Sequence, residues 1–210
     1  MAITKENVRA ARQHLRKNDP VMRDVIDEVG PFTLRPHRDR FTMLVRSIVS
    51  QQISTHAAKT VFTRVADLVA PDRLAPSNVL KCGFDQLRST GLSRQKATYI
   101  LDLAEKTDNN TVRLSTMGRL SDAAVIDELT QVKGIGHWTA QMFLIFALGR
   151  LDVFPHDDLG VRTAIRDRYG LDDLPDKQTS LNIAEPWRPY ASVASWYCWR
   201  VIDLSRKQVQ

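Results

Sequence analysis

A Gly-Ile-Gly sequence at residues 134–136 separates two apolar stretches and constrains the fold more than any other feature of the chain. Glycine can adopt positive φ, and without a Cβ it lets another molecule approach the backbone closely. We therefore expect residues 129–140 to join two helices through a tight hairpin. The second helix, 139–148, is nearly all apolar and should be buried on every side. Amides at its start favour an anion such as a nucleic-acid phosphate, although Gly-x-Gly alone usually indicates only a tight helical turn.

A second motif, Pro155-His156-Asp157-Asp158-Leu159-Gly160, follows about twenty residues later. It places two carboxylates where the next helix, 159–169, is predicted to begin. An aspartate before a helix most often acts as an N-cap, accepting a hydrogen bond from the N2 or N3 amide. A phosphate-binding hairpin followed by a poised carboxylate nevertheless indicates chemistry on DNA.

Apolar residues recur at helical spacing along almost the whole chain, and no segment alternates as a strand would. We therefore predict an all-α fold. Ser93 and Ser121 have the positions of N-caps, and Gly149 and Gly170 those of helix stops. The predicted helices span 6–17, 20–29, 40–53, 57–69, 76–80, 84–89, 93–106, a segment between Ser121 and the hairpin, 139–148, 159–169, 181–184 and 190–204, with a loop at 171–179.

Composition limits the class of protein. The chain has 210 residues, 43% apolar and 26% charged, which is typical of a soluble globular protein of one domain or of two lobes. It has no apolar run of about 20 residues, and its first residues lack the apolar core that a signal peptide would have. Its two cysteines are not expected to make a disulfide framework. We expect an intracellular protein, in the cytoplasm or nucleoid if bacterial and in the nucleus if eukaryotic.

The net charge of +6 suits a polyanionic partner. Residues 35–64 hold six Lys and Arg side chains against the single Asp39. This local excess is either an electrostatic footprint for nucleic acid or a solvated helix face.

Taken together, these segments resemble the helix-hairpin-helix DNA glycosylase superfamily (HhH-GPD), most closely its compact 3-methyladenine DNA glycosylase II type. The resemblance implies a two-lobed helical fold with an active-site cleft between the lobes. Residues 1–210 would form one catalytic unit, with a central lobe at 36–150 that includes the hairpin and a second lobe of 1–35 with 151–210. The matching segments are the hairpin 132–140, the acidic turn 155–162, a DNA-wedging segment 41–58, and 91–97 and 187–200.

The resemblance assigns the catalytic carboxylate to Asp158. Cleavage of an N-glycosidic bond builds positive charge on the sugar, and a fixed carboxylate stabilises that cation or activates water. Asp157 is the rival, with capping of helix 159–169 or orientation of the turn as its other role.

In glycosylases of this superfamily that also cleave the strand, a lysine that forms a Schiff base stands two residues after the second hairpin glycine. Trp138 occupies that position in this chain. An indole cannot form an imine, so we predict a hydrolase without lyase activity. Two cysteines also exclude an iron–sulfur cluster with four cysteine ligands.

Trp138 and Trp196 are the candidate walls of the base pocket, because electron-rich rings attract a cationic alkylated purine. Met142, where a relative has a pocket tyrosine, and Leu159 complete the predicted pocket. The remaining large aromatic residues of the C-terminal segment are interpreted as core: Trp187, Tyr190, Tyr197 and Trp199.

Gln52 stands where the family places the residue that fills the gap left by a flipped base, with Gln51 beside it; the alternative for either is an exposed polar residue in a turn. No cofactor is expected except a Na⁺ or K⁺ that the resemblance implies at the Val132 and Ile135 carbonyls, and no residue cluster has zinc spacing. The predicted DNA-binding residues are Gln51, Gln52, Lys133, Gly134, Ile135, Gly136, His137 and Thr139.

These observations predict a monomeric base-excision repair glycosylase that flips alkylated purines of the 3-methyladenine or 7-methylguanine type out of damaged double-stranded DNA and leaves an abasic site. No membrane partner is expected. The alternatives are a non-catalytic helix-hairpin-helix DNA-binding module and a glycosylase for deaminated or oxidised bases.

Overall fold

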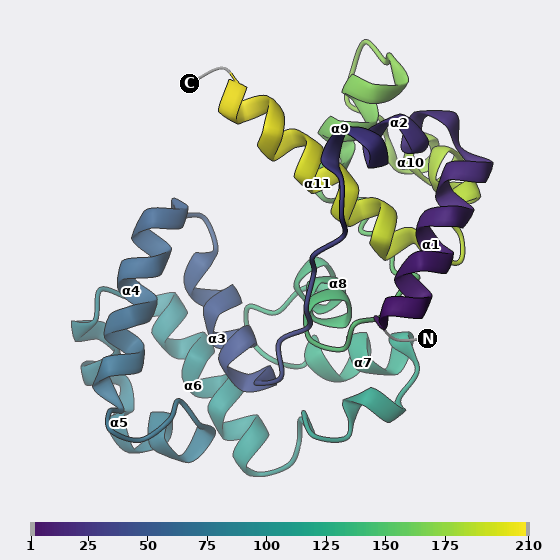
Figure 1. The fold of residues 1–210 in the computed structure, drawn as a ribbon. Helices are drawn as coiled ribbons and strands as arrows, with labels where there is room; N and C mark the ends of the chain where they lie inside the picture. The colour runs from purple at the N-terminus through teal and green to yellow at the C-terminus, as the bar shows by residue number, and fades with distance from the viewer. Residues whose placement is uncertain (1–2, 209–210) are drawn as a thin grey trace. The chain divides into compact units, whose positions relative to one another are not determined.

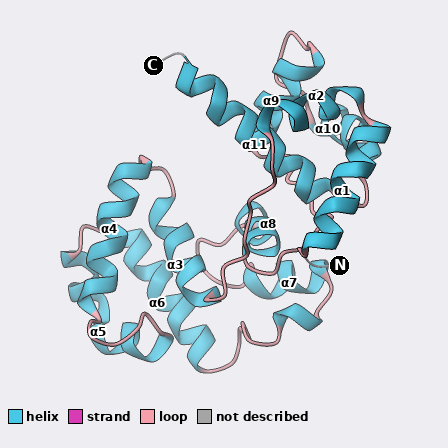
Figure 2. Cartoon of the chain, viewed as in Figure 1, coloured by secondary structure: helices cyan, strands magenta, loops and turns pink. Residues whose placement is uncertain are grey.

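The computed structural model describes residues 3–208, and its ribbon consists of helices joined by loops (Figures 1 and 2). No residue of this range lies in a β-strand, which confirms the predicted all-α fold. The chain divides into two compact units, one formed by residues 37–143 and the other by 1–36 together with 144–210. None of the helices in the described range has the length and apolarity needed to cross a bilayer.

The unit at 37–143 contains five complete helices and the beginning of a sixth. Each of Asp39, Ser54, Ser93 and Ser121 caps a helix, its side-chain oxygen accepting a hydrogen bond from a first-turn amide. The N-caps predicted at Ser93 and Ser121 are therefore confirmed. The helices are α3 (Arg40–Ser50), α4 (Thr55–Leu68), α5 (Pro76–Ser89), α6 (Arg94–Asp108), α7 (Asp122–Leu129) and the first part of α8 (His137–Phe146), with a short 3-10 helix at Met117–Arg119.

The main differences from the predicted boundaries in this unit are in α3, α5 and α8. Helix α3 ends at Ser50 and not at residue 53, because Gln52 adopts a positive φ of 55° that no helix accommodates. The predicted helices 76–80 and 84–89 are the two halves of α5, which is broken at Gly83 with φ 71°. Helix α8 begins two residues earlier than expected and ends at Phe146, before Gly149 with φ 65°.

Helix α8 is buried from Thr139 to Ile145, as its apolar sequence predicted, whereas His137 and Trp138 at its start are exposed. Every side chain from Thr139 to Ile145 is buried, including the polar Thr139 and Gln141. A helix covered on all sides cannot move without unpacking its neighbours. It is therefore a rigid support for the hairpin residues at its N-terminus.

The unit made of 1–36 and 144–210 is built around the fully buried Trp187 and Tyr197. The buried carboxylate of Asp19 accepts from the Met22 amide at 3.0 Å and from the Trp187 indole at 2.8 Å. It also accepts from the Tyr169 hydroxyl, and burial followed by this hydrogen bond raises the pKa of that phenol. The helices are α1 (Lys5–Asn18), α2 (Pro20–Val29), α9 (Leu159–Tyr169), α10 (Lys177–Ala184) and α11 (Ala191–Gln208), with a 3-10 helix at Glu185–Trp187.

The prediction of a loop over 171–179 was wrong at its C-terminal end. Helix α10 begins at Lys177, where the Asp176 side chain accepts from the Thr179 amide at 2.8 Å. Only Ser180 and Ala184 of this helix are buried. Leu181 and Ile183 are partly buried and pack against the core of this unit, in the part that the sequence predicted as a helix at 181–184. The first turn, Lys177–Ser180, contains no apolar residue for a helical pattern to detect.

Candidate functional site

The hairpin between α7 and α8 is closed by short backbone hydrogen bonds. The Val132 amide donates to the Leu129 carbonyl at 3.1 Å, and the Ile135 amide donates to the Val132 carbonyl at 3.1 Å. Val132 and Ile135 are both buried, as expected for apolar residues that pin the turn to the core. The turn is thus anchored from inside, with Gly134 half-buried and Gly136 exposed.

The two glycines of the hairpin have different roles. Gly134 has φ 79°, and a Cβ at this position would lie 2.0 Å from the Tyr99 ring. Gly136 has no positive φ, and a Cβ there would meet nothing within 4 Å. The expectation that both glycines leave backbone open to a ligand therefore holds only for Gly136, because the side of Gly134 is covered by Tyr99.

The open end of α8 presents backbone amides. The first bond of the helix runs from the Ala140 amide to the Gly136 carbonyl at 3.0 Å, so the amides before Ala140 lie at the N-terminus, where an anion is favoured. Gly136, His137 and Trp138 are exposed. Thr139 has a buried side chain, which leaves its amide as the group that can face a phosphate.

Asp102 of α6 fixes the first half of the hairpin. One of its oxygens accepts from the Lys133 amide at 2.8 Å and from the Lys106 ammonium at 2.7 Å, while the Lys133 ammonium lies 3.7 Å from the other. Burial acts to raise the pKa of Asp102, but the hydrogen bonds and charges of Lys106 and Lys133 outweigh it, and the pKa lies below its ordinary value. The backbone of Lys133 is therefore held while most of its side chain extends into solvent.

The turn between α3 and α4 is braced against the hairpin. The Gln51 side-chain amide donates to the Gly134 carbonyl at 2.9 Å. The Lys96 ammonium donates to the Val49 and Gln51 carbonyls at 2.8 and 2.6 Å, and burial lowers its pKa. These hydrogen bonds join the two turns within the same unit, around a cavity of about 520 Å³.

The same hydrogen bonds separate the two glutamines that the sequence left as alternatives. The Gln51 side chain is engaged by the hairpin, whereas Gln52 is exposed at the tip of the turn with φ 55°. Positive φ is costly for a residue with a side chain and persists only where the surroundings enforce it. Ile53 follows it with 40% exposure, so the turn projects one polar and one apolar side chain.

The acidic turn lies in the other unit, at the start of α9. Asp158 is only 8% exposed, and its Oδ1 accepts from the Val161 amide at 2.9 Å and from the Trp199 indole at 2.8 Å. The Asp157 side chain is 70% exposed and pairs with His156 at 2.9 Å. The N-cap of α9 is therefore Asp158, and the alternative that assigned this cap to Asp157 is wrong.

Trp199 is the site residue that the sequence did not reveal. It was interpreted as core, but it is only partly buried, and its indole N–H donates to Asp158. Its ring stacks on Phe146 with centroids 5.3 Å apart. A Cβ on Gly160 would lie 3.0 Å from the Trp199 ring and 3.2 Å from the Asp158 oxygen, so the glycine makes this approach feasible. In the sequence, Gly160 two positions after Asp158 was the feature that could have predicted a close contact at this turn.

The predicted pocket residues differ in accessibility. Trp138 and Leu159 are 42% and 64% exposed, whereas Met142 and Trp196 are buried. Trp196 lies in the same unit as Asp158, packs on Phe32 with centroids 4.6 Å apart, and lines a cavity of about 550 Å³. The guanidinium of Arg200 lies 5.9 Å from the centre of its ring. Trp187 and Tyr197, interpreted as core, are fully buried, which confirms that interpretation.

Comparisons with known proteins agree in sequence and in fold. Residues 45–189 match the HhH-GPD superfamily of base excision DNA repair proteins. The alkylbase DNA glycosidase-like protein mag2 of Schizosaccharomyces pombe is 28% identical over 202 residues, which cover 94% of this chain and 95% of the relative. DNA-3-methyladenine glycosylase 1 of the same yeast is 32% identical over 202 residues, covering 93% of this chain and 88% of the relative. The solved structure of an S. pombe 3-methyladenine DNA glycosylase (Mag1) in complex with abasic DNA superposes with a TM-score of 0.83 at 32% identity, over 93% of this chain and 98% of that one.

The contrast between the hairpin glycines gives a prediction. Gly134→Ala should lower the free energy of unfolding by about 2 kcal/mol or more, because the added methyl group overlaps the Tyr99 ring at a left-handed position. Gly136→Ala should leave stability nearly unchanged and still weaken binding to any duplex DNA, since it obstructs the open backbone. Urea unfolding and fluorescence anisotropy measure the two effects. Equal stability losses in the two variants would contradict the assignment.

Proposed function

Because this chain belongs to the HhH-GPD superfamily of base excision DNA repair proteins, we propose that it releases alkylated purines from double-stranded DNA by hydrolysing the N-glycosidic bond, leaving an abasic site. The observation that carries the proposal is the Asp158 carboxylate, buried and held by two hydrogen bonds at the start of α9. The names of the two yeast relatives, an alkylbase glycosidase-like protein and a 3-methyladenine glycosylase, support the choice of substrate.

Asp158 would act as a fixed negative charge. As the base leaves, positive charge builds on the sugar, and a carboxylate already oriented beside it needs no reorganisation to stabilise that charge. The Trp199 indole and the Val161 amide donate to the same oxygen and so fix the orientation of the group. The carboxylate can also orient or deprotonate the attacking water. We assign Trp199 a positioning role.

The positive charge of the leaving base explains why tryptophan rings would line the pocket. An alkylated purine carries positive charge before cleavage, so it attracts the face of an indole and departs without a strong general acid. Trp138 is exposed enough to stack on such a base, and Trp196 borders a cavity in the unit that holds Asp158. Release of a neutral deaminated or oxidised base would gain less from either ring.

The hairpin and the α3–α4 turn would contact DNA in different ways. The open amides of α8 would hold a backbone phosphate, which carries no sequence information. Gln52 would fill the gap left by the flipped base, because Gln51 is already bonded to the Gly134 carbonyl. The Val132 carbonyl accepts from the Ile135 amide and keeps a second lone pair, so it fits a shared site with the Ile135 carbonyl for a Na⁺ or K⁺ that supplies positive charge beside the phosphate.

The direct test of the function is a set of duplexes, each with a single lesion: 3-methyladenine, 7-methylguanine, ethenoadenine, hypoxanthine or 8-oxoguanine. Alkali cleaves the strand wherever a base has been released. Cleavage confined to the alkylated lesions supports the proposal, and cleavage confined to hypoxanthine or 8-oxoguanine points to a deaminated- or oxidised-base enzyme. DNA binding without cleavage of any duplex would indicate a non-catalytic module.

Replacement of the carboxylate should separate chemistry from binding. Asp158→Asn should slow single-turnover base release by at least about 10²-fold while DNA affinity is retained or increased, because a negative charge near the phosphates is removed. Asp157→Asn is the matched control and should keep most of the activity, since that side chain is largely exposed.

Trp199→Phe provides an intermediate case, because it keeps the ring stacked on Phe146 and removes only the donor to Asp158. We expect a fall in the single-turnover rate of about tenfold with little change in affinity. If Trp199→Phe is as active as the wild type, Trp199 does not position the carboxylate. If Asp157→Asn is as inactive as Asp158→Asn, the assignment of catalysis to Asp158 alone is wrong.

The indole at position 138 predicts base release without strand cleavage. Incubation with a lesion duplex should produce abasic sites that remain intact until alkali is added. Sodium borohydride should trap no covalent complex, because Trp138 offers no amine where lyases have one. A trapped adduct that maps to a lysine would overturn the assignment.

The role of Gln52 predicts a dependence on base pairing. Gln52→Ala should slow excision of a lesion opposite its normal partner more than excision of the same lesion at a mismatch, because flipping costs least where pairing is weak. Single-turnover rates for both duplexes measure the effect, and Ile53→Ala tests the neighbouring exposed side chain. An equal defect of Gln52→Ala in both duplexes would mean that Gln52 does not fill the gap.

A further inference from the structure

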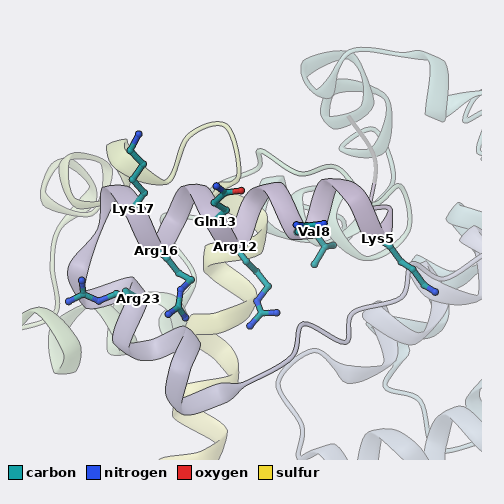
Figure 3. Close-up of a pocket in the computed structure, with 8 residues that line it drawn as sticks. Lys5, Val8, Arg12, Gln13, Arg16, Lys17 and Arg23 are labelled. Carbon is teal, nitrogen blue, oxygen red and sulfur yellow. The ribbon is translucent and has the colours of Figure 1, made fainter.

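Helix α1 borders a strongly positively charged region in the unit made of 1–36 and 144–210. A groove of about 640 Å³ lies along this helix and reaches Arg23 of α2. Figure 3 shows Arg12 and Arg16 extending from the same side of α1, with Lys5 and Lys17 near its two ends. We call this region the α1 groove and define it by its cationic residues, which are Lys5, Arg9, Arg12, Arg16, Lys17 and Arg23.

The cations of α1 follow the helical repeat. Residues 5, 9, 12 and 16 are separated by four, three and four positions, which places them on one face of the helix. With a rise of 1.5 Å per residue, they form a row about 16 Å long. Glu6 is the only acidic residue of the helix. The row is therefore an extended line of positive charge.

Neighbouring carboxylates neutralise only part of this charge. Arg16 pairs with Asp27, and Arg23 lies 3.4 Å from Asp24. Arg12 is partly buried and interacts with the Tyr197 hydroxyl. Lys5, Arg9 and Lys17 are exposed and form no ion pair within the described part of the chain. These three side chains are available to an external anion.

We propose that the α1 groove is a second nucleic-acid contact, which binds the phosphate backbone of duplex DNA independently of the hairpin. Duplex DNA carries a negative charge every 1.7 Å or so along its axis. Lys5 and Arg9, one helical turn apart, can therefore meet neighbouring phosphates, and the exposed Lys17 can meet a further one. Of the apolar residues of α1, Ala11 and Leu15 are fully buried, Val8 is partly buried in the lining of the groove, and Ala10 is exposed. The outer face thus lacks the large apolar side chains with which a helix enters a membrane or anchors a peptide.

The α1 groove shares no residue with the hairpin, the α3–α4 turn or the acidic turn. The groove would bind undamaged DNA as readily as damaged DNA, because phosphate contacts carry no sequence information. It rests on the proposed function only for the choice of DNA as the polyanion.

The test compares two triple variants with the same change in net charge. The groove variant is Lys5→Gln, Arg9→Gln and Lys17→Gln; glutamine keeps the helix propensity of α1. The control variant is Arg73→Gln, Lys81→Gln and Lys177→Gln, three exposed cations outside the groove. Affinity for an undamaged 30-base-pair duplex is measured by fluorescence anisotropy between about 0.05 and 0.3 M salt.

We expect the groove variant to bind at least tenfold more weakly than the control at 0.1 M salt, since removal of a single phosphate contact costs about eightfold there. The slope of log affinity against log salt should become shallower by about 0.9 for every phosphate no longer neutralised. Single-turnover excision at saturating protein should be unchanged, which separates this proposal from the proposed function. Equal affinities and slopes in the two variants would overturn the proposal. Binding to polyglutamate, a polyanion without phosphates, is measured in the same way. If the groove variant loses affinity for polyglutamate but keeps its affinity for the duplex, the proposal is also overturned, and an acidic protein partner is indicated.

Discussion

The close approach of the Tyr99 ring to Gly134 is the constraint on which the exposed turns of the 37–143 unit depend. Any Cβ at Gly134 would overlap that ring, so the aromatic side chain lies where a side chain would otherwise be. The Gly134 carbonyl is then positioned to accept from Gln51, and Lys96 holds the backbone of the same turn. Two loops that are distant in sequence become one rigid surface. A surface that binds a flexible polyanion gains affinity from such preorganisation, because fewer groups must be ordered on binding.

The acidic turn repeats this arrangement in the other unit. Gly160 leaves room for Trp199, whose indole donates to Asp158 at 2.8 Å. The same carboxylate oxygen caps α9. Asp158 is therefore a structural residue and a candidate catalyst at once, and its two structural bonds are what hold the charge in one orientation.

Phosphate binding would rest on two different physical bases. At the hairpin, backbone amides at the start of a buried helix offer directional hydrogen bonds and a fixed partial charge. Along α1, exposed side chains would offer full charges that salt screens strongly. The first kind of interaction would set register and the second would add affinity and rate of association, which suits a base excision repair protein that searches a large excess of ordinary DNA. Neither would read sequence, so selectivity would be left to the proposed base pocket.

The sequence by itself determined the elements whose causes are local. Helical periodicity predicted the all-α fold, serine positions predicted the caps of α6 and α7, and the apolar run after Gly136 predicted a buried helix. The resemblance carried by the hairpin and the acidic turn was confirmed by the family match. The tertiary structure alone decided which glutamine is free, because Gln51 bonds to a residue 83 positions away. It likewise showed that the Trp199 indole donates to Asp158, 41 positions away. Such pairings leave no periodic trace, since periodicity records which face of an element is buried but not which atom meets it.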